Sequence, residues 1–301
     1  MTFRLLLLFS TLMSLALQAV ATNAIPVTNT GFDADYYPQN PSAQKITGDK
    51  KYGIIVLNGS SGGKSDFMAK KLHEMGNPVL SLAYFDRKGD GSIPTSLELI
   101  PLEYIAKAKE WLMKQADTKN DGVVIYGLSK GAELALVLAA LDADYKGIIA
   151  TAPSAVVWSG IPKGVKDDYS KASSSWSLQG KPLAFIPYAH RAEFRTDKPT
   201  PMLDWHQSSL NRAKNFNDAL INISNIKAPI LLFSGGQDTA WPSNNMAKLI
   251  CELAKVSNNS QTCTHINYKN APHLLGEKGP AARVEMTKFL AELNKETDNK
   301  K

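Results

Sequence analysis

Short apolar runs rich in β-branched residues alternate with longer stretches of helical periodicity along most of this chain. The short runs predict buried strands at 53–57, 78–82, 123–126, 147–150, 229–234 and 264–268. The longer stretches predict helices at 65–75, 99–115, 132–141, 243–255 and 281–293. Strands that alternate with helices indicate an α/β fold, in which helices cover both faces of a mostly parallel sheet.

The alternation fails at about 153–226, where serine, proline and aromatic residues gather. The large aromatic side chains of this stretch are Trp158, Trp176, Phe185, Tyr188, Phe194 and Trp205. A structureless connection of this length is unusual in a compact domain. We therefore expect one domain at 51–301, with a lid inserted at about 153–226 over the carboxyl edge of the sheet.

The first residues have the pattern of an export signal. Arg4 supplies a positive charge, 5–20 are almost entirely apolar, and Ala19 and Ala21 give the small-x-small form of a cleavage site. The alternative is an uncleaved membrane anchor, because the apolar run is only slightly short for a span. We expect a signal peptide at 1–21, no membrane span after its cleavage, and a periplasmic or secreted chain. The polar, turn-rich segment 22–50 is expected to be a loosely structured lead-in.

Composition limits the classes of partner. Of the 301 residues, 44% are hydrophobic and 21% are charged, which is sufficient for a sizeable core and argues against general disorder. The net charge of +6 is spread along the chain and no basic stripe is interleaved with aromatic residues, so no nucleic-acid partner is expected. No cofactor and no metal site is predicted, and the oligomeric state is left open.

A candidate nucleophile lies between the strand at 123–126 and the helix at 132–141. The sequence Gly127-Leu128-Ser129-Lys130-Gly131 is a G-x-S-x-G nucleophile elbow. The turn from strand to helix must be so sharp that the serine is strained and exposed, and the glycines let the two elements pass without a clash. Ser129 is therefore the predicted nucleophile.

An activated serine needs a base, and the base needs an orienting carboxylate. In this type of site the three residues follow in the order Ser, Asp, His. Asp238 follows the strand at 229–234 and His273 follows the strand at 264–268, so both lie at strand carboxyl ends, where open α/β sheets place their sites. A turn or helix-capping role is the alternative for Asp238.

The remaining histidines and two arginines of the lid are weaker candidates for a role in the active site. His73 and His265 are interpreted as structural, because they lie on an early surface helix and within a strand. His190 and His206 belong to the lid and could contact substrate. Two lid cations could meet an anionic head group or be simply solvated; these are Arg191 and Arg195.

Acyl transfer also needs donors for the oxyanion of the tetrahedral intermediate. The backbone N–H of Lys130 is one candidate, and Ser60 or Ser61 in the loop 58–63 supplies the other. The glycines of this loop suggest a phosphate loop, but only three residues separate Gly59 from Gly63 where a Walker motif has four. Nucleotide hydrolysis is therefore not predicted.

The chain has two cysteines, Cys251 and Cys263. In an oxidising compartment such a close pair can form a disulfide between a helix end and the next strand, and the alternative is two buried thiols. No motif surrounds either residue, so neither is expected to be catalytic.

Several segments are similar to those of a known family. They are Leu80-Ser81-Leu82-Ala83-Tyr84-Phe85, Ile100-Pro101-Leu102-Glu103-Tyr104, the elbow with Ala132-Glu133-Leu134-Ala135-Leu136 after it, Gly236-Gln237-Asp238-Thr239-Ala240-Trp241-Pro242-Ser243, and Pro272-His273. They resemble the carboxyl-terminal domain of acyl-CoA thioester hydrolases and bile acid-CoA:amino acid N-acyltransferases. The resemblance implies an α/β-hydrolase fold with Ser129, Asp238 and His273 as the triad. It favours hydrolysis, because the transferases of the family usually carry cysteine at the elbow.

The sequence thus predicts a serine hydrolase that acts on a small-molecule acyl ester or thioester. Two other functions remain open. The same site could transfer the acyl group to an amine or alcohol acceptor, or the scaffold could be a non-catalytic binding module.

Overall fold

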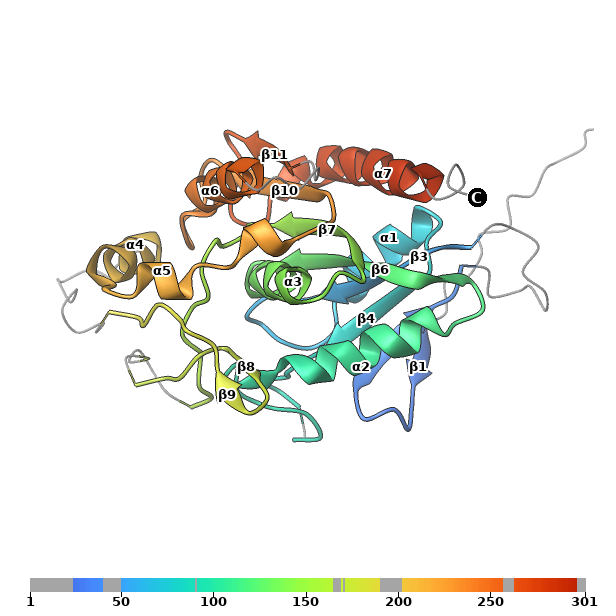
Figure 1. Ribbon diagram of the computed structural model, residues 1–301, viewed down its shortest axis with the longest axis horizontal. Helices are drawn as coiled ribbons and strands as arrows, with labels where there is room; N and C mark the ends of the chain where they lie inside the picture. Colours follow the sequence, from blue (N-terminus) through green and yellow to red (C-terminus); the bar gives the residue numbers. More distant parts are fainter. Residues whose placement is uncertain are drawn as a thin grey trace, which may run out of the picture.

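Eight strands form one twisted sheet in the computed structural model, which describes residues 24–39, 50–89, 91–164, 169, 171–189, 202–256 and 263–296 (Figure 1). The strand order is β1-β2-β4-β3-β6-β7-β10-β11. The strands are β1 (Ile25–Val27), β2 (Asp33–Tyr37), β3 (Lys51–Leu57), β4 (Val79–Ala83), β6 (Thr118–Leu128), β7 (Tyr145–Thr151), β10 (Ile230–Gly235) and β11 (Cys263–Tyr268). From β4 to β11 all neighbours are parallel, whereas β1 and β2 run antiparallel to their neighbours.

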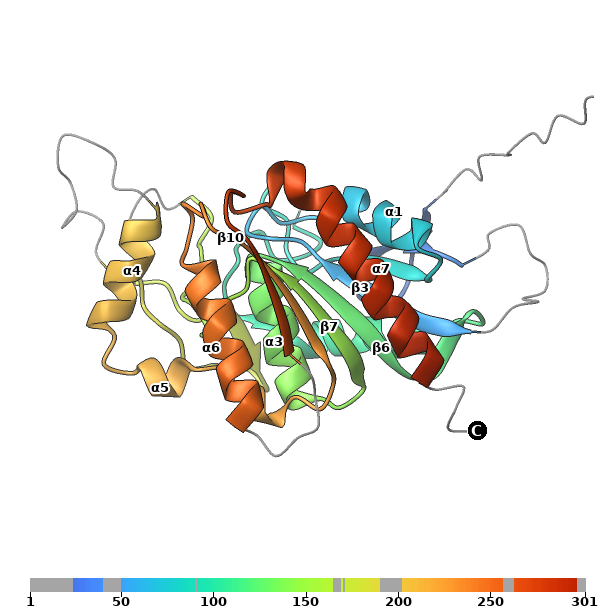
Figure 2. The same cartoon turned by 90° about the horizontal axis from the view of Figure 1, so that it is seen from above.

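Helices cover both faces of this sheet (Figures 1 and 2). On one face α1 (Asp66–Glu74) and α7 (Gly279–Glu296) pack on the inner strands. On the other lie α2 (Leu102–Met113), α3 (Lys130–Leu141) and α6 (Ser243–Val256). Burial from both sides explains why the inner strands are continuously apolar rather than alternating. The predicted α/β-hydrolase architecture is therefore confirmed, together with each expected strand and helix of the sheet region.

The expectation of a loosely structured lead-in is wrong for the described residues 24–39. Here β1 and β2 extend the sheet beyond β4. Polar partners from distant segments hold them: the Tyr36 hydroxyl donates to the Asp117 carboxylate, which also accepts the Gln39 N–H at 2.7 Å. Lys64 pairs with Asp35 at 3.0 Å. These contacts order a segment whose polar composition resembles that of a loop.

Between β7 and β10 the chain leaves the sheet and forms the insertion, which we call the lid. Its elements are β8 (Trp176–Leu178), β9 (Lys181–Pro182), α4 (Met202–Arg212), α5 (Phe216–Ala219) and the 3-10 turn η2 (Ile223–Asn225). A strand from outside the lid, β5 (Ile100–Pro101), joins β8 and β9 in a small second sheet. Figure 2 shows α4 and α5 at the left, with α6 between them and the strands of the main sheet.

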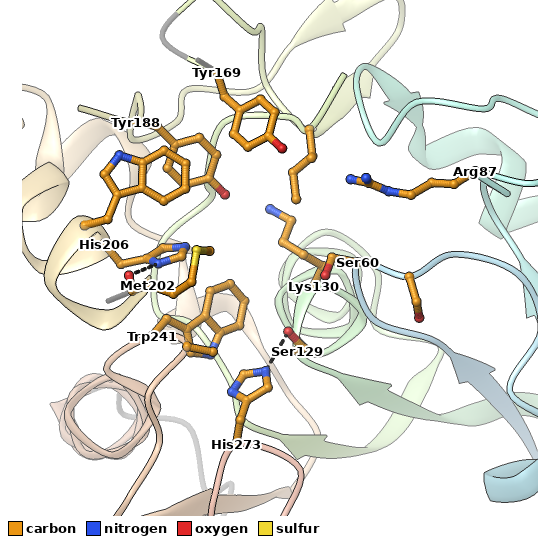
Figure 3. Close-up of a pocket in the computed structure, with 14 residues that line it drawn as sticks. Ser60, Arg87, Ser129, Lys130, Tyr169, Tyr188, Met202, His206, Trp241 and His273 are labelled. Carbon is orange, nitrogen blue, oxygen red and sulfur yellow. Dashed lines mark hydrogen bonds between the residues drawn. The ribbon is translucent and has the colours of Figure 1, made fainter. Parts of the chain in front are cut away.

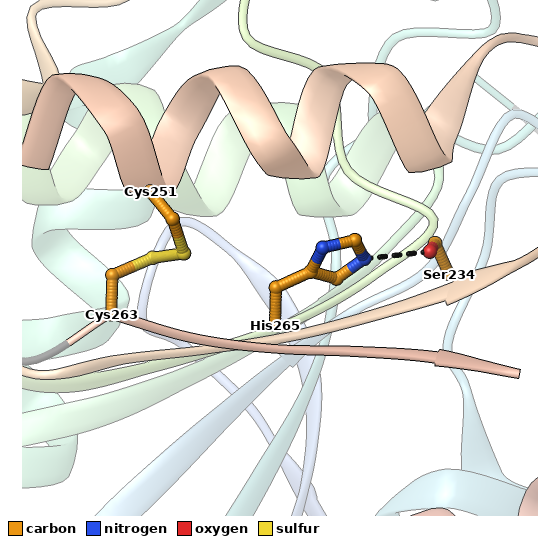
Figure 4. The surroundings of a disulfide bond; sticks show 4 residues. All are labelled: Ser234, Cys251, Cys263 and His265. Atoms are coloured by element: carbon orange, nitrogen blue, oxygen red, sulfur yellow. Dashed lines mark hydrogen bonds between the residues drawn. A yellow bond between two sulfur atoms is a disulfide. The ribbon is translucent and has the colours of Figure 1, made fainter.

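A disulfide joins Cys251 on α6 to Cys263 at the start of β11, with 5.3 Å between the Cα atoms (Figure 4). It settles the choice between a disulfide and two thiols. The predicted signal peptide at 1–21 lies outside the described residues. None of the helices in the described ranges combines the length and apolar character that a bilayer crossing requires.

Candidate active site

The nucleophile elbow has the strained geometry that its sequence predicts. Ser129 stands between β6 and α3 with φ 55° and ψ −117°, a region that non-glycine residues rarely enter. The flanking glycines allow close backbone contact: a Cβ at Gly127 would lie 2.1 Å from the Gly131 oxygen, and one at Gly131 would lie 2.4 Å from the Leu57 oxygen. No other residue fits these two positions without moving the strand or the helix.

Three side chains from separate strand ends meet above the sheet. The Nε2 atom of His273 lies 3.0 Å from Ser129 Oγ, and its Nδ1 atom lies 2.7 Å from Asp238 Oδ2 (Figure 3). Ser129 and His273 are 144 residues apart in the chain. The structure thus brings the predicted serine, histidine and aspartate into one hydrogen-bonded relay.

Backbone hydrogen bonds fix the loops that carry the acid and the base. The Gln237 N–H donates to the Ala271 oxygen and the Gly236 N–H donates to the Tyr268 oxygen, each at 2.9 Å. These bonds tie the turn after β10 to the turn after β11. The positions of Asp238 and His273 are therefore set by the main chain rather than by their side chains alone.

The Asp238 carboxylate is nearly buried, with 3% of its side chain exposed. Burial alone would raise its pKa, but hydrogen bonds from His273, Ser243 and Ala240 hold the pKa below its usual value. The Ser243 hydroxyl donates at 2.5 Å and the Ala240 N–H at 2.8 Å. An ionised carboxylate is what a histidine needs for orientation and for stabilisation of its charged form.

The predicted oxyanion donors lie beside Ser129. Gly59 adjoins the nucleophile, since a Cβ there would lie 3.3 Å from Ser129 Cβ. The N–H groups of Gly62 and Gly63 donate within the fold, to Gly59 and Phe85. Those of Ser60 and Ser61 donate to no group in the described part of the chain. The N–H of Lys130 belongs to the first turn of α3, where helix geometry provides no internal acceptor.

The side chain of Lys130 has a separate role that the sequence does not reveal. Its Nζ atom lies 2.7 Å from Glu133 Oε2, and both side chains are at most 2% exposed. Burial lowers the pKa of Lys130 and raises that of Glu133, while their attraction opposes both shifts. Glu133 also accepts the Trp158 N–H at 3.0 Å and the Trp176 indole N–H at 2.7 Å. This carboxylate joins the elbow helix to the lid.

A cavity of about 460 Å³ opens over Ser129 and His273. One wall is aromatic and comes mainly from the lid, where the Tyr188 and Trp205 rings stack at 4.5 Å. His206 packs edge-on against Trp158 at 4.9 Å, and burial lowers its pKa to about 4. Its Nδ1 atom lies 2.8 Å from the Met202 oxygen. The ring is therefore neutral at neutral pH.

Not every histidine or arginine considered from the sequence reaches this cavity. His206 lines it, as expected of a lid residue. The Nε2 atom of His265 lies 2.7 Å from Ser234 Oγ in the sheet (Figure 4). His73, on α1, packs against Tyr37. Three more lid residues fall outside the described ranges: His190, Arg191 and Arg195.

Sequence reasoning missed several residues that shape the site. Glu133 lies in a largely apolar, buried helix. The only sequence signal for its role is a charged residue among positions expected to be buried. Ser243 caps the carboxylate of Asp238, and Trp241 lies between the lid and His273, with ring centres 5.9 Å apart. Arg87 faces the cavity from the loop after β4. These roles depend on partners distant in the sequence.

Together the elbow, the order of the three residues and the sheet define the α/β-hydrolase class. Solved structures of this class match the chain: Est1E from Butyrivibrio proteoclasticus has a TM-score of 0.54 and 15% sequence identity, with 90% of this chain and 98% of that one covered. Within the class, the chain belongs to the BAAT / acyl-CoA thioester hydrolase C-terminal family, whose model matches residues 100–291.

Curated relatives agree with the family. Acyl-coenzyme A thioesterase 1 of Homo sapiens is 28% identical over 203 residues, which are 66% of this chain and 43% of the relative. Acyl-coenzyme A amino acid N-acyltransferase 1 of Mus musculus is 37% identical over 99 residues, or 33% of this chain and 22% of the relative. The chain therefore spans less than half the length of these relatives.

Proposed function

We propose that this protein is a serine hydrolase that cleaves an ester or thioester through an acyl-enzyme on Ser129. The observation that carries the proposal is the relay from Ser129 through His273 to Asp238, with contacts of 3.0 and 2.7 Å. Family membership supports the reaction type, and the strained elbow supports Ser129 as the nucleophile.

The proposed reaction follows from this geometry. His273 Nε2 takes the proton of Ser129 Oγ as the oxygen attacks the acyl carbon, and later gives it to the leaving oxygen or sulfur. The Asp238 carboxylate holds the Nδ1 proton and stabilises the imidazolium. The N–H of Lys130, with that of Ser60 or Ser61, binds the oxyanion. Water then attacks the acyl-enzyme, with His273 again as the base.

Two alternatives predict other outcomes of the same experiments. A transferase would give an amide or a new ester when an amine or alcohol acceptor is added, and the match to an N-acyltransferase keeps this product worth measuring. A binding module would have no use for a complete relay. Its Asp238 carboxylate, of which only 3% is exposed, would be desolvated at a cost without performing any reaction.

The test is the Ser129→Ala variant with a panel of p-nitrophenyl esters and acyl-CoA thioesters. We expect kcat to fall by about 10³-fold or more, because the remaining groups provide only binding and oxyanion contacts. Labelling by a fluorophosphonate should occur in the wild type and disappear in the variant.

A matched control is Ser224→Ala, which removes an exposed hydroxyl from the 3-10 turn η2. It should keep both kcat and labelling. Turnover by Ser129→Ala at the wild-type rate would refute the acyl-serine mechanism. Failure of the wild type on every member of the panel would instead favour the binding module.

We also propose that the mature chain is exported and cleaved after about residue 21. The apolar run at 5–20 supports this, and so does the Cys251–Cys263 disulfide, since such bonds persist in oxidising compartments. Expression of the full chain in a Gram-negative host should yield a periplasmic protein whose mass lacks the first 21 residues. An uncleaved chain in the membrane fraction would support the anchor instead.

A further inference from the structure

One cation in the cavity, Arg87, has no partner among the residues that the structure describes. Arg87 lines the cavity from the loop that follows β4, and Figure 3 shows its guanidinium directed inward from the side opposite Tyr188. Its Nε atom is buried without a hydrogen-bond partner, and its side chain makes no ion pair with any residue in the described ranges. A buried donor left unpaired is costly, so such a group is expected to find a partner in a ligand.

Asp86, the acidic residue directly before Arg87, already forms hydrogen bonds within its own turn. The Asp86 carboxylate accepts the Lys88 N–H at 2.9 Å, and the Asp86 carbonyl accepts the Gly89 N–H at 3.2 Å. The Asp86 N–H in turn donates to the Pro94 oxygen at 2.9 Å. This turn fixes the backbone on both sides of Arg87. The guanidinium is therefore presented to the cavity by an anchored loop.

The charges of the cavity favour an anion. Its described lining contains no Asp or Glu. The second cation, Lys130, is neutralised by Glu133, and His206 is uncharged at neutral pH. Within the described part of the chain, Arg87 thus adds a positive charge without a counter-ion beside aromatic surface. A planar guanidinium with paired donors suits carboxylate and phosphate oxygens.

We infer that Arg87 binds an anionic group, a carboxylate or a phosphate, of the ester or thioester substrate. The inference rests on the proposed function and adds to it a substrate class: an acyl compound with an apolar or aromatic body and a negative charge. The charge can belong to the acyl part or to the leaving group. The guanidinium would act in binding and specificity, and it touches no bond that breaks.

The test compares substrates in pairs that share the same scissile bond, of which one member is neutral and the other carries an anionic group. In the first arm, p-nitrophenyl hexanoate is paired with mono-p-nitrophenyl adipate, which carries a carboxylate at the end of the acyl chain. In the second, the hexanoyl thioester of N-acetylcysteamine is paired with hexanoyl-CoA, whose phosphates are on the leaving group. For each pair the ratio of kcat/KM, charged over neutral, is measured in wild type, Arg87→Gln and Arg87→Lys.

We expect Arg87→Gln to lower this ratio at least about tenfold in one arm, through KM, because a charge-assisted hydrogen bond is lost. Arg87→Lys should restore part of it. The arm that responds identifies where the charge resides. The matched control is Lys88→Gln, which removes an adjacent exposed charge outside the cavity and should keep the ratio. Unchanged ratios in both arms of Arg87→Gln would overturn the inference.

A binding measurement separates this inference from the proposed mechanism. The four compounds are titrated by calorimetry into Ser129→Ala protein with and without Arg87→Gln. Weaker binding of a charged member when Arg87 is replaced supports the anion site even if Ser129 proves not to be the nucleophile. If each compound binds equally tightly to both proteins, the inference is contradicted, whatever the kinetics show.

Discussion

The two walls of the cavity are held in place by different forces. On the sheet wall, the three relay residues sit on turns whose backbones are bonded to neighbouring strands, as when the Ser129 N–H donates to the Thr151 oxygen at 2.9 Å. On the lid wall, Trp205 and His206 are fixed by ring packing and by side-chain hydrogen bonds, such as that from the Trp205 indole to the Ala189 oxygen at 2.8 Å.

This difference separates reaction from recognition. Strand order fixes the sheet wall, so its geometry tolerates changes of side chain around it. Aromatic packing fixes the lid wall, so a new side chain there changes the shape available to substrate. We expect substitutions of the three relay residues on the sheet wall to affect kcat, and substitutions on the lid wall to affect KM and stability. Three experiments test this contrast, from the largest expected effect to the smallest.

The first is Asp238→Asn on the sheet wall. The amide keeps the shape of the side chain but favours the wrong tautomer of His273, so kcat should fall about 10⁴-fold. The melting temperature should change little. Steady-state kinetics on the ester panel measures the change in kcat. Asp218→Asn, which changes an exposed aspartate of the lid, is the matched control and should keep kcat. A kcat for Asp238→Asn within tenfold of the wild type would contradict the assigned orientation role.

The second experiment addresses the junction of the walls. Glu133→Gln leaves Lys130 as a buried charge without a counter-ion and weakens the anchor of Trp158 and Trp176. We expect the free energy of unfolding to fall by about 3–5 kcal/mol, measured by urea denaturation. Glu74→Gln breaks the exposed pair with Lys71 and should cost less than about 1 kcal/mol. Equal losses in the two variants would mean that the buried pair is not needed to join the walls.

The third experiment uses pH to probe the lid alone. In the unfolded chain His206 binds a proton below its ordinary pKa of 6.5, whereas in the folded protein the pKa is about 4. The neutral ring therefore contributes its full stability above pH 6.5, and this stability is lost as the pH falls toward 4. The loss amounts to about 3 kcal/mol between pH 7 and pH 4.

His206→Phe keeps an aromatic ring and removes the titration. The difference in unfolding free energy between pH 7 and pH 4 should therefore shrink by about 3 kcal/mol in this variant. The pKa values of His73 and His265 are also lowered by burial, but both residues are present in the two proteins, so their effect cancels in the comparison. If the free energy of unfolding had the same pH dependence in His206→Phe and wild type, burial in the lid would not be what keeps His206 neutral.

The sheet wall could be predicted from sequence because its signals are local. Strand and helix periodicity identify the elements, and the elbow motif with the order of Ser129, Asp238 and His273 places the residues on strand ends. The lid could be recognised only as a break in the alternation. Its shape depends on contacts such as Trp176 with Glu133, which lie 43 residues apart, and no local pattern encodes them.

The first two strands were missed for a related reason. The segment Asp33–Tyr37 of β2 alternates acidic and buried residues, so its acidic side chains suggest a loop. Its order depends on Lys64 and Asp117, which the fold brings from elsewhere. Arg87 likewise has no sequence signal, because its importance comes from a cavity that only the folded chain forms and whose described lining holds no acidic residue.

The disulfide has a consequence for resistance to proteolysis. β11 is the last strand of the sheet and leads directly to the loop of His273, while Cys251 lies on the helix after β10. If a protease cut the chain between Val256 and Cys263, the piece with the base would stay covalently attached to the piece with the nucleophile and the acid. A nicked protein would keep all three relay residues in one molecule until a reductant released them.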